Sequence, residues 1–125
     1  MRSVLLFALL LGVPSLATAQ NMNAEEFHKR ANALKAKGPL ALLSMGEIKA
    51  LQAEGKGAGE AARANRLAAQ KAGKKPRYCP PEVPQSMTSD EYMKRLSAIT
   101  QAQRQKIDMT EATTQIMIAK YPCPS

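Results

Sequence analysis

The chain has 125 residues, with 18 Lys or Arg against 10 Asp or Glu, so its formal net charge at pH 7 is +8. A chain of this length forms at most one small domain. One His and two Cys supply too few ligands for a four-ligand structural zinc site, so we expect no metal and no cofactor.

The first 19 residues have the pattern of a secretory signal peptide. Arg2 supplies the positive start, an unbroken apolar run covers 4–11, and Ala17-Thr18-Ala19 is a small-x-small cleavage site. The run is shorter than the roughly 20 residues of a membrane-spanning helix. An uncleaved amphipathic helix is the alternative interpretation. We expect cleavage before Gln20 and a soluble mature domain, 20–125, located in the periplasm or, alternatively, outside the cell.

The two cysteines lie in similar surroundings, Tyr78-Cys79-Pro80-Pro81 and Tyr121-Pro122-Cys123-Pro124. Two cysteines in an exported chain predict a disulfide between Cys79 and Cys123. The bond would close a loop of about 45 residues, which is worth roughly 4 kcal/mol in the loop-entropy model. A metal pair, a free reactive thiol and a disulfide between chains are the competing interpretations.

The first predicted helix begins at a capping box, Asn23-Ala24-Glu25-Glu26. Met22 and Phe27 have the spacing of a hydrophobic staple across this box. Gly38-Pro39 ends the helix, and a short apolar run, 40–43, follows. One face of the helix is apolar at i, i+4, i+7 spacing: Phe27, Ala31 and Leu34.

A second capping box, Ser44-Met45-Gly46-Glu47, predicts a long helix to Ala72, with Gly73 as terminator. Leu43 and Ile48 have the staple spacing. The alternative is a break at 55–59, because each Gly costs roughly 1 kcal/mol in a helix interior. The predicted buried face carries mostly small residues: Ile48, Leu51, Gly55, Ala58, Gly59 and Ala62.

Prolines in residues 74–87 predict a loop, and two more helices follow it. The box Thr88-Ser89-Asp90-Glu91 opens the third helix, which ends near Ala98. Thr100 opens the last helix, which Pro122 ends. We expect Tyr92, Met93 and Leu96 on the apolar face of the third helix, and Ile107, Ala112, Ile116 and Met117 inward on the last.

No period-two alternation of β-branched residues persists for five positions, so no strand is predicted. The sequence therefore predicts an all-α fold, a small bundle of about four helices stapled by one disulfide.

The candidate catalytic groups have simpler explanations. No Ser or Cys is identifiably placed beside His28, so we expect His28 at the surface or at the edge of the core. The pairs Glu25-Glu26 and Asp90-Glu91 lie in first helical turns, where the helix dipole favours carboxylates. The glycines of 55–59 lack the strand and the GK[ST] ending of a phosphate loop. We expect no catalytic residue and no enzyme.

Basic residues gather around the end of the long helix: Lys71, Lys74, Lys75 and Arg77. They form a candidate patch for an anionic partner, such as lipid head groups, envelope polymers or an acidic protein. The simpler interpretation is a solubilising surface. The export signal and the lack of interleaved aromatic residues argue against nucleic acid.

The stretch from Tyr78 to Cys123 resembles the C-terminal half of the Tai/Rap family, periplasmic immunity proteins against type VI secretion amidase effectors. The shared features are Tyr78-Cys79-Pro80-Pro81 with nearby Val83, an intervening helix carrying Tyr92, Met93 and Leu96, and the ending Tyr121-Pro122-Cys123. The resemblance implies a small, disulfide-bonded helical fold, in many members a homodimer. It also implies binding, with the immunity protein blocking the active-site groove of an amidase.

Two hypotheses of different class follow. The first is an inhibitory binding protein of the immunity type, whose partner is an amidase effector. The second is a small periplasmic chaperone or stress protein with one disulfide. A hydrolase ranks third, because no nucleophile–base pair is identifiable.

Overall fold

The computed structural model describes residues 21–83 and 85–125. The predicted signal peptide lies outside the described residues. None of the described helices is long and apolar enough to cross a membrane.

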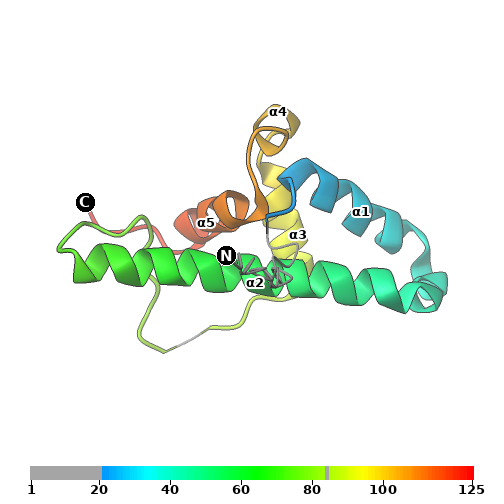
Figure 1. The fold of residues 1–125 in the computed structure, drawn as a ribbon, viewed down its shortest axis with the longest axis horizontal. Helices are drawn as coiled ribbons and strands as arrows, with labels where there is room; N and C mark the ends of the chain where they lie inside the picture. Colours follow the sequence, from blue (N-terminus) through cyan, green and yellow to red (C-terminus); the bar gives the residue numbers. More distant parts are fainter. Residues whose placement is uncertain (1–20, 84) are drawn as a thin grey trace, which may run out of the picture.

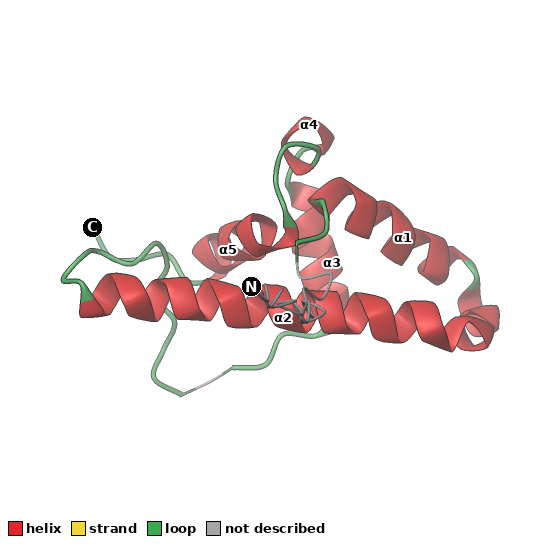
Figure 2. Ribbon diagram, in the orientation of Figure 1, coloured by secondary structure: helices red, strands yellow, loops and turns green. Residues whose placement is uncertain are grey.

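The described chain is all-α, as predicted, and contains no β-strand in the described ranges. Its elements are α1 (Ala24–Ala36), a 3-10 segment (Gly38–Ser44), α2 (Met45–Lys71), α3 (Ser89–Ala98), the single turn α4 (Gln101–Arg104) and α5 (Met109–Lys120). The long helix α2 is the axis of the fold: α5 lies along one half of it and α1 extends over the other, as Figures 1 and 2 show.

The start of α1 and the end of α2 confirm two sequence predictions. Asn23 Oδ1 accepts the backbone N–H groups of Glu25 and Glu26 at 3.0 and 3.3 Å, so Asn23 is the N-cap. Gly73 adopts a φ of +72° just after α2, the left-handed conformation that ends a helix and that glycine adopts without strain. The glycines of 55–59 lie inside a continuous α2, so the alternative of a break is wrong.

The start of α2 differs from its prediction. The helix begins at Met45, but Ser44 caps no helical N–H; its hydroxyl accepts a hydrogen bond from Lys37 Nζ at 3.1 Å. In a hydrophobic staple Leu43 would pack against Ile48 and lose much of its exposure. Leu43 is 85% exposed, so the predicted staple does not form. The buried stripe of α2 also includes Glu54 and Gly57, whereas Gly55 and Gly59 are only half-buried.

The predicted last helix is wrong as one continuous element. It is divided into α4 and α5 because the linker between them bonds to the start of α1. The carbonyl of Ile107 accepts the N–H of Ala24 at 2.9 Å, and Met109 N–H donates to the carbonyl of Met22 at 2.8 Å. Backbone groups used in this way cannot also continue a helical ladder. Asp108 then caps α5, accepting the N–H of Glu111 at 2.8 Å.

The core lies where α1, α2, α3 and α5 meet. Phe27 and Tyr92 pack edge to face, with ring centroids 6.3 Å apart, and the Tyr92 hydroxyl bonds to Thr113 Oγ1 at 2.6 Å. Of the residues predicted to face inward, Ala112 and Ile116 are buried, and Ile107 and Met117 are half-buried. The buried apolar cluster consists of Ala24, Phe27, Leu51, Ala58, Leu96, Met109, Ala112 and Ile116.

The predicted disulfide joins Cys79 and Cys123. Beside it, Cys79 N–H donates to the carbonyl of Tyr121 at 2.8 Å. Residues 74–87, apart from the undescribed Pro84, contain neither helix nor strand. The bond and its neighbouring hydrogen bond therefore attach this loop to the end of α5.

Candidate functional site

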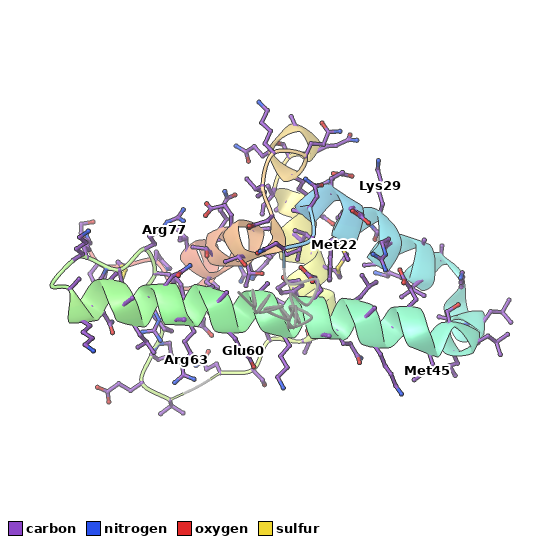
Figure 3. All side chains as sticks on the ribbon, in the orientation of Figure 1. Met22, Lys29, Met45, Glu60, Arg63 and Arg77 are labelled. Carbon is purple, nitrogen blue, oxygen red and sulfur yellow. A yellow bond between two sulfur atoms is a disulfide. The ribbon has the colours of Figure 1, made fainter. Side chains whose placement is uncertain are left out.

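The turn between α1 and α2 forms an apolar tip, defined here as Leu40, Leu42, Leu43 and Met45. The three leucines are 65%, 69% and 85% exposed, and Met45 is 46% exposed. Figure 3 shows Met45 at one end of the molecule, where the two helices join. Of the six large hydrophobic residues that are exposed in the described chain, four belong to this tip. A gathering of this kind is typical of a contact surface, whereas single exposed leucines are common.

The conformation of the tip follows from its glycine and proline. Gly38 adopts a φ of +55°, which lets the chain turn sharply after α1, and Pro39 lies in the first turn of the 3-10 segment. A 3-10 segment has three residues per turn. Its apolar residues therefore spread around the axis instead of forming one buried face.

An ion pair between helices braces the tip. Arg30 of α1 donates to both carboxylate oxygens of Glu47 of α2, at 2.6 and 2.7 Å. This fork-to-fork geometry fixes the relative position of the two helices better than a single contact does. The hydrogen bond from Arg30 holds the pKa of Glu47 below the ordinary glutamate value of 4.5. The brace therefore persists at neutral pH.

A groove lies beside the tip, between α1, α2 and the start of α3. Its volume is about 540 Å³. Its lining is largely apolar and includes Phe27, Leu34, Leu51, Met87, Tyr92 and Met93. The groove has the size of a pocket that takes a side chain or a small apolar ligand.

The predicted basic patch is divided in the structure. Arg77 of the loop donates to the two carboxylate oxygens of Glu111 at 2.8 and 2.9 Å, and this pairing lowers the pKa of Glu111. Lys71, Lys74 and Lys75 are exposed at the end of α2 and in the loop after it. Arg77 therefore serves an internal ion pair, while the three lysines stay available to an anionic partner.

His28 does lie beside a serine, which sequence reasoning missed. Its Nε2 is 2.9 Å from Ser97 Oγ, across the α1–α3 contact, and its Nδ1 is 3.9 Å from Glu25 Oε1. The second distance is too long for a hydrogen bond, so Glu25 does not orient the ring as a base requires. Burial and the nearby Arg104 together lower the pKa of His28, against a smaller opposing effect of Glu25.

Glu25 instead belongs to a buried ion pair. Arg104 Nε donates to Glu25 Oε2 at 2.9 Å, and the two side chains are 8% and 7% exposed. Arg104 also donates to the carbonyl of Ile99. The two residues are 79 positions apart in the chain, so no local spacing in the sequence predicts that they pair.

Within the described ranges no group of three or more His, Cys, Asp or Glu side chains is placed to hold a metal ion. Comparisons of the chain with protein-family models, with curated proteins and with solved structures gave no significant match.

Proposed function

We propose that this chain is an exported binding protein of the immunity type, which inhibits a periplasmic peptidoglycan amidase effector by inserting its apolar tip into the active-site groove of that enzyme. The observation that carries the proposal is the braced, exposed run of three leucines at the α1–α2 turn. The resemblance of the Cys79–Cys123 segment to immunity proteins supplies the class of partner.

The energetics favour a protein partner with a concave apolar surface. Moving one leucine side chain from water to a fully buried site is worth about 1.5–3 kcal/mol. The tip presents three such side chains on a short, preorganised segment, so little conformational entropy is lost on binding. A convex apolar anchor of this kind is complementary to a cleft.

Charge around the tip indicates an acidic rim on the partner. Lys35, Lys37 and Lys49 are exposed near it, whereas the nearest acidic residue, Glu47, is neutralised by Arg30. The chain as a whole carries a formal charge of +8. Complementary charges of this kind accelerate association and select the partner.

Co-expression with a candidate amidase directed to the periplasm tests this proposal. We expect the wild-type chain to protect cells from lysis, and an amidase encoded beside this gene is the first candidate. Leu43→Asp should abolish protection, while Leu67→Asp, which changes another exposed leucine on the other half of α2, should not. Lysis despite folded, exported wild-type protein would contradict the proposal for that amidase.

The groove favours a second candidate function, a small periplasmic chaperone. Its apolar lining and volume of about 540 Å³ suit the apolar side chains of an unfolded client segment. Acid would also release the Arg30–Glu47 brace beside it, because protonated Glu47 loses its charge. Because Arg30 lowers the pKa of Glu47, the brace is lost only as the pH falls through that lower value. At about pH 3, in the acid range of carboxyl titration, the protein should suppress aggregation of a client. An inert result in a light-scattering assay would remove this candidate.

A further inference from the structure

A second hollow lies on the other half of α2 from the tip, and we propose that it binds a carboxylate that carries an apolar or aromatic body. Its volume is about 320 Å³. It is enclosed by α2, by the loop that carries Cys79 and by the end of α5, and its lining includes Arg63, Arg66, Tyr78, Pro80, Met117 and Tyr121. Figure 3 places Arg63 on this half of α2, well separated from Met45 of the tip.

Arg66 carries the chemical argument. Its guanidinium carbon lies 5.4 Å from the centre of the Tyr78 ring, a cation–π distance, and Tyr78 itself is only 3% exposed. The Nε atom of Arg66 is buried and has no hydrogen-bond partner among the described residues. A buried N–H group without an acceptor costs stability, so the guanidinium of Arg66 is incompletely paired. Because Nε itself has no exposed surface, a carboxylate in the hollow would accept from the terminal amino groups of Arg66.

The second guanidinium stands one turn earlier. Gly59, Arg63 and Arg66 follow i, i+4, i+7 spacing, so the three residues share one face of α2. No ion pair is seen for Arg63 or Arg66 within the described ranges. One exposed carboxylate, Glu82, also lines the hollow. Two guanidiniums against one carboxylate leave a net positive site, which matches a single negative charge.

The side chains that line the hollow indicate the chemistry of the uncharged part of the ligand. Tyr78, Tyr121, Pro80 and Met117 supply aromatic and apolar surface, and Gly59 adds no side chain to the α2 wall. A Cβ placed at Gly59 would have no atom within 4 Å, so the space in front of it is open. An aromatic or aliphatic body fits such walls better than a compact, fully hydrated anion does. No residue of the tip lines this hollow.

The test is a titration of the purified, disulfide-bonded protein, followed by the NMR shifts of the Tyr78 and Tyr121 amides. Benzoate should cause saturable shifts, whereas benzamide, its neutral counterpart, and inorganic phosphate should not. Arg66→Gln should weaken benzoate binding by about tenfold or more, since a charge-assisted hydrogen bond is lost. Lys94→Gln, which removes one exposed charge from α3 outside the hollow, should leave binding unchanged.

Two further variants keep the test decisive. If Arg66→Gln does not fold, Arg63→Gln removes the second guanidinium from the hollow. Gly59→Leu keeps both charges and fills the open space, so it should abolish binding of benzoate without lowering the melting temperature. Benzamide or phosphate binding as well as benzoate, or unchanged binding in both the arginine and the glycine variants, would overturn the proposal.

The source of the carboxylate is a separate arm of the experiment. A pentapeptide ending in a free phenylalanine carboxylate, compared with its amidated form, represents the end of a polypeptide. Binding of the free peptide in preference to benzoate supports a chain end as the ligand. The reverse order supports a free small carboxylate, and no binding of either contradicts the site.

Discussion

At the residue scale, the buried Arg104–Glu25 pair joins α1 to α4. Removing one partner of a buried ion pair leaves the other charge without compensation, at a cost of about 3–5 kcal/mol. Arg104→Ala should therefore lower the free energy of unfolding by that amount in urea denaturation. The double change Arg104→Met with Glu25→Met should cost less than Arg104→Ala. Equal stability of wild type and Arg104→Ala would show that the pair contributes nothing.

Several titratable groups make the fold less stable in acid. Arg30, Lys120 and Arg77 lower the pKa of Glu47, Glu91 and Glu111, mainly through hydrogen bonds. A carboxylate with a depressed pKa stabilises the fold above the ordinary value of 4.5, and this contribution is lost as the pH falls through the lower folded-state value.

His28 acts in the same direction at higher pH. Burial lowers its pKa below 6.5, so the unfolded chain takes up the proton first as the pH falls. Urea midpoints should therefore decline in two stages, one starting near 6.5 and one below 4.5. His28→Gln should remove only the first stage. A first stage that persists in this variant would contradict the assignment.

At the scale of elements, we expect the loss of the N-cap side chain to destabilise the protein at α5 but hardly at α2. Asp108 accepts the N–H of Glu111, whereas Ser44 caps no N–H group. Asp108→Ala should cost about 1 kcal/mol, the usual value of an N-cap. Ser44→Ala should cost much less, although the sequence places Ser44 in an apparent capping box. Thermal melts of the two variants check the difference, and a larger loss for Ser44→Ala would reverse it.

The element boundaries show where sequence reasoning succeeds and where it fails. Asn23 and Thr88 mark helix starts correctly, because a cap is a local device that involves neighbouring residues. The break between α4 and α5 was missed, because its cause is the pairing of Ile107 and Met109 with the start of α1, more than 80 positions away. One local signal was available: Asp108-Met109-Thr110-Glu111 is itself a capping box.

At the scale of the whole molecule, one covalent bond attaches a segment without helix or strand to the end of α5. Cys79 and Cys123 are 44 positions apart, and the loop-entropy model assigns roughly 4 kcal/mol to such a bond. Replacing both cysteines by serine should therefore lower the melting temperature markedly. Reduction of the wild type should have the same effect. An unchanged melt in both cases would mean that α2 and α5 hold the end of the chain without the bond.

The candidate sites were less predictable than the fold. The number and sequence surroundings of the cysteines predict the disulfide, and helical periodicity predicts much of the core. In the sequence the tip is recognisable only as a short apolar run, 40–43. The exposure of its leucines depends on the Gly38 turn and on the Arg30–Glu47 ion pair, which the sequence does not predict. No local pattern in the sequence distinguishes Arg63 and Arg66, because the hollow beside them forms only where the folded loop brings Tyr78 against α2.

The most direct test of the account is the affinity of the purified protein for a periplasmic amidase effector, measured by calorimetric titration. The wild type and the Leu67→Asp control should bind with nanomolar affinity. Leu43→Asp should bind at least about tenfold more weakly, because a charge replaces a side chain that we propose is buried in the amidase groove. Equal affinity of the Leu43→Asp variant and the wild type would contradict the claim that the tip is the inhibitory surface.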